Sequence, residues 1–258
     1  MDRDEEKVAL RLYVCGRPAV EYGTYVVRDR DLPARQGRRF WAYMVVNHRR
    51  AVGRDELMEA IWGDEIPDSW DTVMSAVASR LRAVLRPFAG AGLSIESAPG
   101  CYILRLPVDV FIDYERAREA IHAADAAARR SDQTVALAEA RVAMEIAARG
   151  FLPGEEAPWI LRERSLLHEI QIRAAERTVQ GELARGHPDL AEDEARLLVR
   201  LDPLRESGYR LLMQALVAAG NRGALADVME TCRTTLRDLG GMVPSAETEA
   251  VFTELTRR

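Results

Sequence analysis

The hydrophobic positions in the first part of the chain change their period twice, from strand-like to helix-like and back. Alternating and β-branched residues predict strands over residues 8–14 and 22–27, with a turn at residues 16–18 between them. Two further runs of this kind, residues 93–97 and 101–106, predict a β-hairpin. The chain is therefore expected to begin with a small sheet and to return to strands after a helical stretch.

Three helices are predicted between these two pairs of strands, over residues 35–47, 54–63 and 70–85. Their apolar residues recur at three- and four-residue spacings, as in helices that bury one face. Phe40 and Trp62 occupy such apolar positions, so we expect them in the core rather than as stacking platforms. A sheet, three helices and a hairpin, in this order, are typical of a winged helix-turn-helix.

The predicted helix over residues 70–85 has two different faces. The apolar face is expected to pack on the first two helices, and it comprises Met74, Val77, Leu81, Val84 and Leu85. The other face carries small or hydroxyl side chains followed by arginines, and it includes Thr72, Ser75, Ser79, Arg80, Arg82 and Arg86. Small residues allow close approach to DNA, and the guanidinium fork of arginine matches phosphates and guanine edges. We therefore predict that Arg80 and Arg82 read or anchor bases; the alternative is ordinary pairing with acidic neighbours at the surface.

The other candidate DNA contacts lie in the hairpin and in the first helix. Gly100 and Arg105 of the hairpin are expected near the DNA backbone. Tyr102 is expected mainly to pack the base of the hairpin and less to touch DNA. Arg38 and Arg39 precede a buried helix face, and the sequence leaves open whether they form solvent-exposed pairs or contacts to the DNA backbone.

Charge is distributed unevenly along the chain. The formal net charge of −5 resides in residues 113–258, which hold 20 basic against 25 acidic residues, whereas residues 1–112 hold 16 of each. Residues 28–54 contain eight arginines and two aspartates. Such a local excess either tracks a phosphate backbone or forms an ordinary solvated face. The acidic second half is expected to stay off the DNA.

The second half of the chain has an almost purely helical pattern with an internal repeat. LARGHPDLAEDEARLLV aligns with LVAAGNRGALADVMETC so that Gly186 meets Gly220, a shift of 34 residues. The same shift pairs Leu183 with Val217, Leu190 with Ala224 and Leu198 with Cys232. Thirty-four residues is the tetratricopeptide period. The predicted fold is therefore mainly α with a small β component: a winged helix-turn-helix followed by an all-α, tetratricopeptide-like domain.

Several functional classes lack support in the sequence. Lys7 is the only lysine, so there is no P-loop, and there is no nucleophile elbow, HExxH or paired-carboxylate motif. The three cysteines and four histidines make no cluster with metal-ligand spacing. We expect neither an enzyme nor a bound cofactor or metal. Without a signal peptide or an apolar run long enough for a bilayer, the protein is expected in the cytoplasm, with no membrane contact.

Three motifs together resemble the Streptomyces antibiotic regulatory protein family, whose winged helix is similar to that of two-component response regulators. An ELxxxLWG-like second helix, an SRLR-bearing third helix and a PGYxL wing occur here as ELMEAIWG, SRLR and PGCYIL. Val77–Ala78 stands where the family commonly has a bulky aromatic residue before SRLR. LDPLRESGYRLLMQAL, RTTLRDLGG and PSAETEAVFTEL are similar to the bacterial transcriptional activator domain that follows the winged helix in this family.

The resemblance implies a DNA-binding domain over residues 8–110 and an activator domain over residues 111–258. It also implies double-stranded DNA and RNA polymerase, through a sigma factor or the alpha subunit, as partners, and a dimer or higher assembly on promoter repeats. Two alternatives remain open from the residues. A repressor would use the same helix and wing, and an interaction scaffold would use the tetratricopeptide-like groove to bind a peptide.

Overall fold

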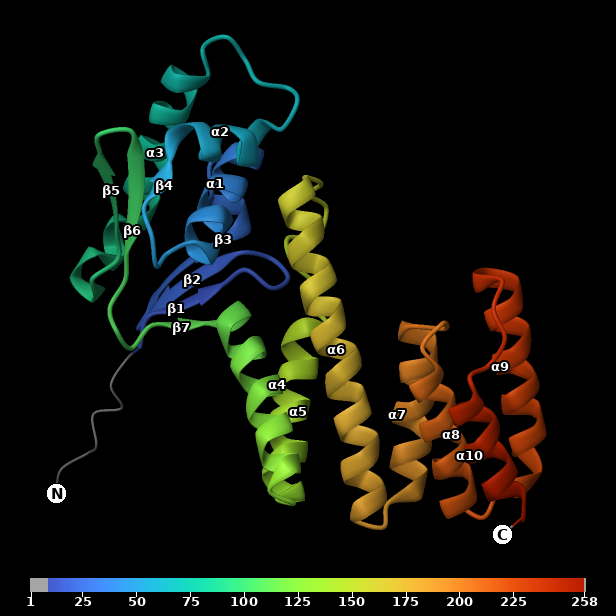
Figure 1. Cartoon of the computed structure of the whole chain (residues 1–258). Coiled ribbons are helices and arrows are strands. Elements are labelled where there is room, and N and C mark those ends of the chain that lie inside the picture. Colours follow the sequence, from blue (N-terminus) through green and yellow to red (C-terminus); the bar gives the residue numbers. More distant parts are fainter. Residues whose placement is uncertain (1–8, 258) are drawn as a thin grey trace, which may run out of the picture. The chain divides into compact units, whose positions relative to one another are not determined.

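The computed structural model describes residues 9–257, and these form two compact units. Unit 1 contains the residues up to Arg116 together with Arg149–Leu167, and unit 2 contains Ala117–Ala148 and the residues from His168 onward. Unit 1 is thus discontinuous in sequence, because 149–167, a segment within the predicted activator domain, packs with the N-terminal part. Figure 1 labels the elements of both units.

A four-stranded sheet opens unit 1, in the order β3-β2-β1-β7. Its strands are β1 (Arg11–Tyr13), β2 (Ala19–Tyr22), β3 (Tyr25–Arg28) and β7 (Phe111–Ile112). The prediction of one strand over residues 22–27 is wrong, because the chain turns at Gly23–Thr24 and residues 19–28 form an antiparallel hairpin. Residue 8 of the first predicted strand lies outside the described residues. Strand β7 closes the sheet by pairing in parallel with β1.

The three predicted helices follow as α1 (Ala34–Val46), α2 (Arg54–Trp62) and α3 (Trp70–Leu85). Phe40, Leu57, Met74 and Leu81 are fully buried between them, which confirms the predicted apolar faces at these positions, whereas Trp62 and Val84 are half-buried. The 3-10 turn Arg86–Ala91 then ends α3 at Pro87. A second sheet pairs β4 (Val52–Gly53) with the hairpin of β5 (Ser94–Ala98) and β6 (Cys101–Arg105).

Unit 2 consists of helices. Within the described residues they are the later part of α4 (Asp113–Arg129), α5 (Gln133–Ala147), the later part of α6 (Pro158–Ala184), α7 (Pro188–Leu201), α8 (Glu206–Ala218), α9 (Leu225–Gly240) and α10 (Ala246–Arg257). The break between α4 and α5 has no strong sequence signal. It is made by Ser131 at a positive φ of 60° and by the Asp132 side chain, which caps α5 by accepting from the Val135 backbone N–H at 3.1 Å.

The 34-residue repeat is visible in the turns that end α6 and α8. Gly186 donates its N–H to Leu183 O at 3.1 Å, and Gly220 donates to Val217 O at 3.0 Å. Both glycines have φ near +80°, which explains why glycine occurs at these positions. The paired Leu198 and Cys232 are both fully buried. The predicted mainly helical, tetratricopeptide-like second part is therefore confirmed, and Figure 1 shows α7–α10 side by side.

None of the helices formed by residues 9–257 is both long enough and apolar enough to cross a membrane.

Candidate nucleic-acid interface

One face of α3 is open to solvent and carries several of the predicted DNA contacts. Its exposed side chains include Thr72, Ser75, Ser79 and Arg80, and the exposed Arg86 follows directly after the helix. The opposite face is anchored in the core through Met74, Val77 and Leu81. Within residues 9–257, the side chains of Arg80 and Arg86 form no hydrogen bond or ion pair. Their guanidinium groups are therefore available to an external acceptor.

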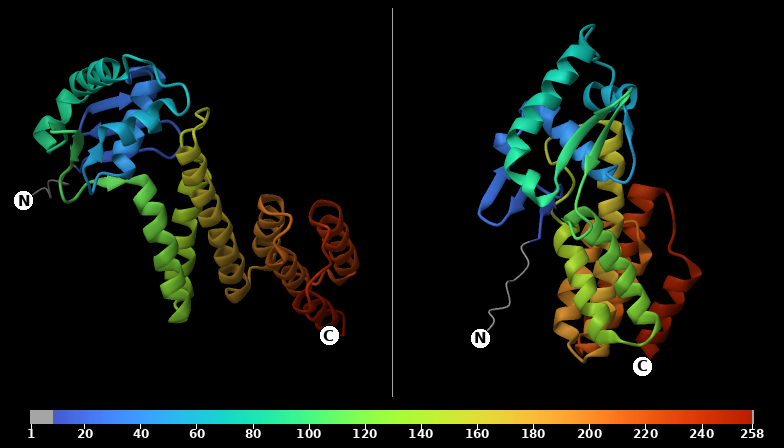
Figure 2. Two further views of the ribbon diagram at one scale, coloured as in Figure 1. Left: turned by 45° about the horizontal axis from the view of Figure 1, so that its top comes forward. Right: turned by 90° about the vertical axis from the view of Figure 1, so that its left-hand side faces the viewer.

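Arg82 lies on the same helix, but its side chain is held by the wing, which consists of β5, β6 and the turn between them. Its Nε donates to Ile95 O at 2.7 Å, and its Nη2 donates to Ser97 Oγ at 2.7 Å. The right-hand view of Figure 2 shows this hairpin beside α3. These two bonds leave the two N–H groups of Nη1 and one N–H of Nη2 for the predicted role of Arg82 in reading bases.

Tyr102 lies beneath two guanidinium groups at the junction of α2, α3 and the wing. Its side chain is buried and packs edge-on against the Phe40 ring, with 5.2 Å between the ring centroids. The Cζ atoms of Arg54 and Arg82 lie 5.2 and 5.9 Å from the centroid of the Tyr102 ring, within the range of cation–π interactions. The expected packing role of Tyr102 agrees with this burial.

Arg54, the first residue of α2, is an additional candidate that was not singled out from the sequence. Its Nη1 donates to the Tyr102 hydroxyl at 2.8 Å, and its Nη2 donates to Ser75 Oγ at 3.1 Å. It also pairs with Asp71 at 2.6 Å. Arg54 therefore connects α2, α3 and β6. Its position directly after Gly53, where the chain enters the predicted second helix, was the available signal.

The wing presents Gly100 at its exposed tip, with Arg105 farther along β6. Arg105 is exposed and pairs with Glu96 on the neighbouring strand at 3.0 Å. Such an exposed pair contributes little to stability and is weakened by salt, so an approaching phosphate can compete for Arg105.

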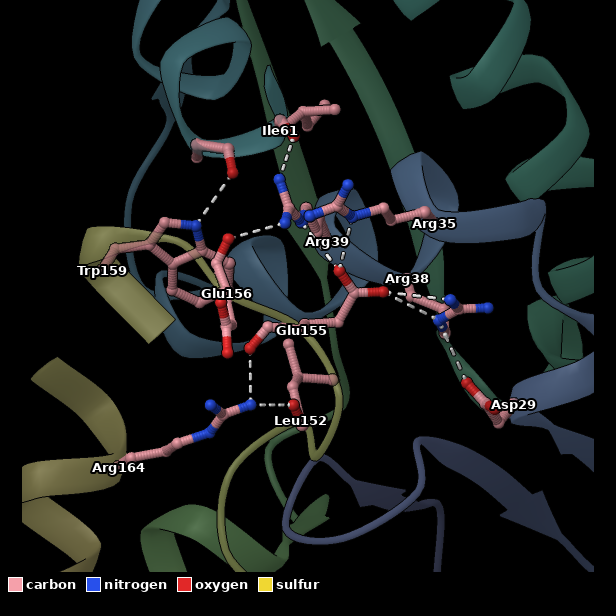
Figure 3. A network of polar contacts seen from close by, with 11 residues as sticks. Asp29, Arg35, Arg38, Arg39, Ile61, Leu152, Glu155, Glu156, Trp159 and Arg164 are labelled. Carbon is pink, nitrogen blue, oxygen red and sulfur yellow. Dashed lines mark hydrogen bonds and ion pairs between the residues drawn. The ribbon is translucent and has the colours of Figure 1, made fainter. Parts of the chain in front are cut away.

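The expected surface position of Arg39 is wrong. Arg39 is only 4% exposed, and it donates to Glu155 Oε2 at 2.9 Å, Ile61 O at 2.7 Å and Glu156 O at 2.8 Å. Figure 3 shows Arg35 and Arg38 converging on the same Glu155 carboxylate. Both alternatives drawn from the sequence placed Arg39 in solvent or on DNA, and neither included a buried partner far along the chain.

Glu155 is the shared counter-charge of Arg35, Arg38 and Arg39. Burial alone would raise the pKa of Glu155, but hydrogen bonds from the three arginines outweigh it and hold the pKa below its usual value. The Trp159 indole, which donates to Ala60 O at 2.9 Å, and Arg164, which donates to Glu155 O at 2.6 Å, fix the surrounding segment. These contacts, drawn in Figure 3, explain why residues 149–167 belong to unit 1.

Other arginines of the 28–54 stretch are also paired with carboxylates. Arg49 lies 2.9 Å from Glu115, and Arg50 bonds to Glu56. Hydrogen bonds from Arg50 lower the pKa of Glu56 to about 2. The local positive excess seen in the sequence is therefore largely compensated within the fold, and the exposed face of α3 supplies the clearest unpaired positive charge.

A protein-family comparison identifies the second part of the chain. The model of the bacterial transcriptional activator domain matches residues 112–256, more than half of the chain. The chain belongs to this family. The resemblance to Streptomyces antibiotic regulatory proteins is likewise confirmed by relatives from Streptomyces.

Two relatives of this chain are regulators of Streptomyces coelicolor. The chain is 30% identical over 241 residues to Regulatory protein AfsR of Streptomyces coelicolor, covering 92% of this chain and 23% of AfsR. It is 26% identical over 209 residues to Transcriptional regulator RedD of the same organism, covering 80% of this chain and 59% of RedD. It thus spans about a quarter of AfsR and under two thirds of RedD.

The fold of the family member is also found in Mycobacterium tuberculosis EmbR, solved in complex with a low-affinity phosphopeptide. The TM-score is 0.84 at 21% identity, covering 97% of this chain and 66% of the EmbR chain. This likeness confirms the predicted fold class of a winged helix followed by a helical, tetratricopeptide-like domain.

Proposed function

We propose that the protein is a sequence-specific DNA-binding transcription regulator of the cytoplasm, and that it activates transcription. The observation that carries this proposal is the exposed face of α3, where Arg80 and Arg86 have no partner within the described residues and are flanked by small hydroxyl side chains. A helix that is anchored by its apolar face and presents such a surface fits the major groove.

In the proposed complex, α3 enters the major groove and Arg80 reads or anchors bases. Around it, Thr72, Ser75, Ser79 and Arg86 approach the groove edges and phosphates, while Gly100 and Arg105 of the wing lie against the neighbouring minor-groove backbone. Arg39 and the buried Tyr102 ring are excluded from this set by their burial. Arg38 is also left out, because it pairs with Glu155 and Asp29.

Replacing Arg80 with alanine is expected to weaken binding to a selected duplex by about 1–3 kcal/mol. A duplex enriched from a random library by the full chain serves as the probe, and an unselected duplex of equal length serves as the reference. Affinity is measured over a salt series for the wild type, Arg80→Ala and Arg130→Ala. Arg130 is the matched control because it is exposed, forms no ion pair within residues 9–257, and lies far along the chain between α4 and α5.

If Arg80 contacts a base, its loss also relaxes specificity, whereas loss of a phosphate contact weakens both duplexes alike and lowers the salt slope by about one. Arg130→Ala should leave both quantities unchanged. Feeble, equal binding of both duplexes by all three proteins would reject DNA reading by α3 and favour the interaction scaffold.

The activating half of the proposal rests on the family. We infer that the protein assembles as a dimer or higher oligomer on promoter repeats and recruits RNA polymerase through a sigma factor or the alpha subunit. Transcription in vitro from the selected site, with and without the protein, distinguishes activation from repression by the same DNA-binding mode.

A further inference from the structure

Two serine hydroxyls of the candidate interface are held in a defined hydrogen-bonding state. Ser75 Oγ on α3 accepts from Arg54 Nη2 at 3.1 Å, and Ser97 Oγ on β5 accepts from Arg82 Nη2 at 2.7 Å. A serine hydroxyl has one proton to donate and two lone pairs to accept with. Within residues 9–257, neither of these two hydroxyls donates a hydrogen bond, so the proton of each can be donated to an external acceptor.

The two arginines that hold these hydroxyls are themselves restrained. Arg82 also donates to Ile95 O, and Arg54 also donates to Asp71 and to the Tyr102 hydroxyl. Both guanidinium groups lie against the buried Tyr102 ring. A guanidinium has only donors, so the hydroxyl oxygen must face it and the hydroxyl proton must point away.

We infer that Arg54 and Arg82 are positioning residues, which act on DNA through the hydroxyl protons of Ser75 and Ser97 rather than by reading bases themselves. DNA phosphates only accept hydrogen bonds. A hydroxyl whose proton already points away from the protein is therefore oriented to donate to a phosphate before the DNA binds. Ser75 would donate a hydrogen bond to DNA at the groove edge along α3, and Ser97 would donate one to the DNA backbone beside the wing. This inference rests on the proposed function.

The geometry favours this assignment over a direct phosphate contact by Arg82. Its Nε and one N–H of Nη2 are already used by a backbone carbonyl and a hydroxyl, so only Nη1 and the second N–H of Nη2 remain for a phosphate. Lysine retains the positive charge and binds phosphate well as a point charge, but it cannot bond these two acceptors in the planar geometry of the guanidinium. Arg82→Lys therefore separates a charge role from a positioning role.

Binding of the selected duplex is measured for the full chain as wild type, Arg82→Lys, Ser97→Ala and the double variant. We expect each single change to weaken binding roughly 10- to 150-fold, which corresponds to the loss of one hydrogen bond to a charged group. The double variant should be less than about twofold weaker than the weaker single variant, because both changes remove the same contact. The salt slope should be unchanged, since no charge is lost.

Ser94→Ala is the matched control, because Ser94 is an exposed serine on the same strand that takes no part in the proposed contact. Its affinity should equal that of the wild type. The pair Arg54→Lys and Ser75→Ala forms a second cycle with the same expectation. Tryptophan fluorescence during unfolding shows whether each variant retains a folded unit 1.

Three results would overturn the inference. Wild-type affinity in Arg82→Lys would show that binding does not need the hydrogen bonds of the Arg82 guanidinium to Ile95 and Ser97. Losses that multiply in the folded double variant would show that the two side chains act independently. If the wild type prefers no duplex and Arg80→Ala binds as the wild type does, the proposed function fails and this inference fails with it; specific wild-type binding with an unaffected Arg82→Lys removes only the inference.

Discussion

Glu155→Ala is expected to lower the free energy of unfolding of unit 1 by about 3–5 kcal/mol, because removing one partner of a buried ion pair leaves the other charge uncompensated. Arg39 is buried and, within residues 9–257, would lose its only carboxylate partner and keep two backbone carbonyls as acceptors. Arg35 would also lose its carboxylate partner, and Arg38 would keep Asp29 alone.

All four tryptophans of the chain, at positions 41, 62, 70 and 159, lie in unit 1. Tryptophan fluorescence during denaturant unfolding therefore reports on this unit alone. Glu156→Ala is the matched control, since the neighbouring glutamate is exposed and its contribution to the network is a backbone carbonyl. If Glu155→Ala and Glu156→Ala unfold at the same denaturant concentration, the Glu155 carboxylate does not stabilise unit 1 as proposed.

Asp113→Ala is the second change expected to have a large effect, costing unit 1 about 2–4 kcal/mol at neutral pH. The buried Asp113 carboxylate accepts the backbone N–H groups of Val14 at 2.9 Å and Cys15 at 3.0 Å, where the chain leaves β1. Without it these buried donors lose their acceptor, at a cost of about 1–3 kcal/mol each, partly offset by removal of a buried charge. Glu119→Ala, at an exposed position of α4, should have little effect on the same fluorescence transition.

The two carboxyl groups should respond to pH in opposite directions. Burial raises the pKa of Asp113 to about 6, against the opposing effect of its backbone hydrogen bonds. Its stabilising contribution is therefore complete below the unfolded pKa and declines as the pH rises through about 6. The cost of Asp113→Ala should be larger at pH 4 than at pH 7, and an equal cost at both would refute this.

For Glu155 the pKa is lowered, so its contribution is complete above the unfolded pKa and is lost as the pH falls through the folded pKa. The difference in stability between the wild type and Glu155→Ala should accordingly shrink on acidification. Fluorescence-detected unfolding of both variants at several pH values distinguishes the contribution of Asp113 from that of Glu155.

Local signals in the sequence were sufficient to predict the helix that carries the candidate interface. The predicted helix over residues 70–85 coincides with α3, because its apolar spacing and the following Pro87 are both local features. The repeat in the second half was visible for a similar reason: Gly186 and Gly220 are each required by the backbone of a helix end.

Contacts between distant residues were not predictable in this way. The partner of Arg39 lies 116 residues farther along the chain, and a single arginine carries no mark of the carboxylate it will meet. The two-residue strands β4 and β7 are too short to show a period. The hydrogen bond between Arg82 and Ser97 was not predictable either, because it depends on the cross-strand pairing of Ser97 with Tyr102 and on the direction of the Arg82 side chain.

The discontinuity of unit 1 limits how this chain could exchange its N-terminal part with that of a relative by recombination. A single crossover near residue 110 would join α1 from one parent to a 149–167 segment from another, and Arg39 would then face whatever residue the second parent carries at position 155. Chimaeras should therefore work when both stretches come from the same parent, or when the donor of the second stretch also supplies a glutamate there.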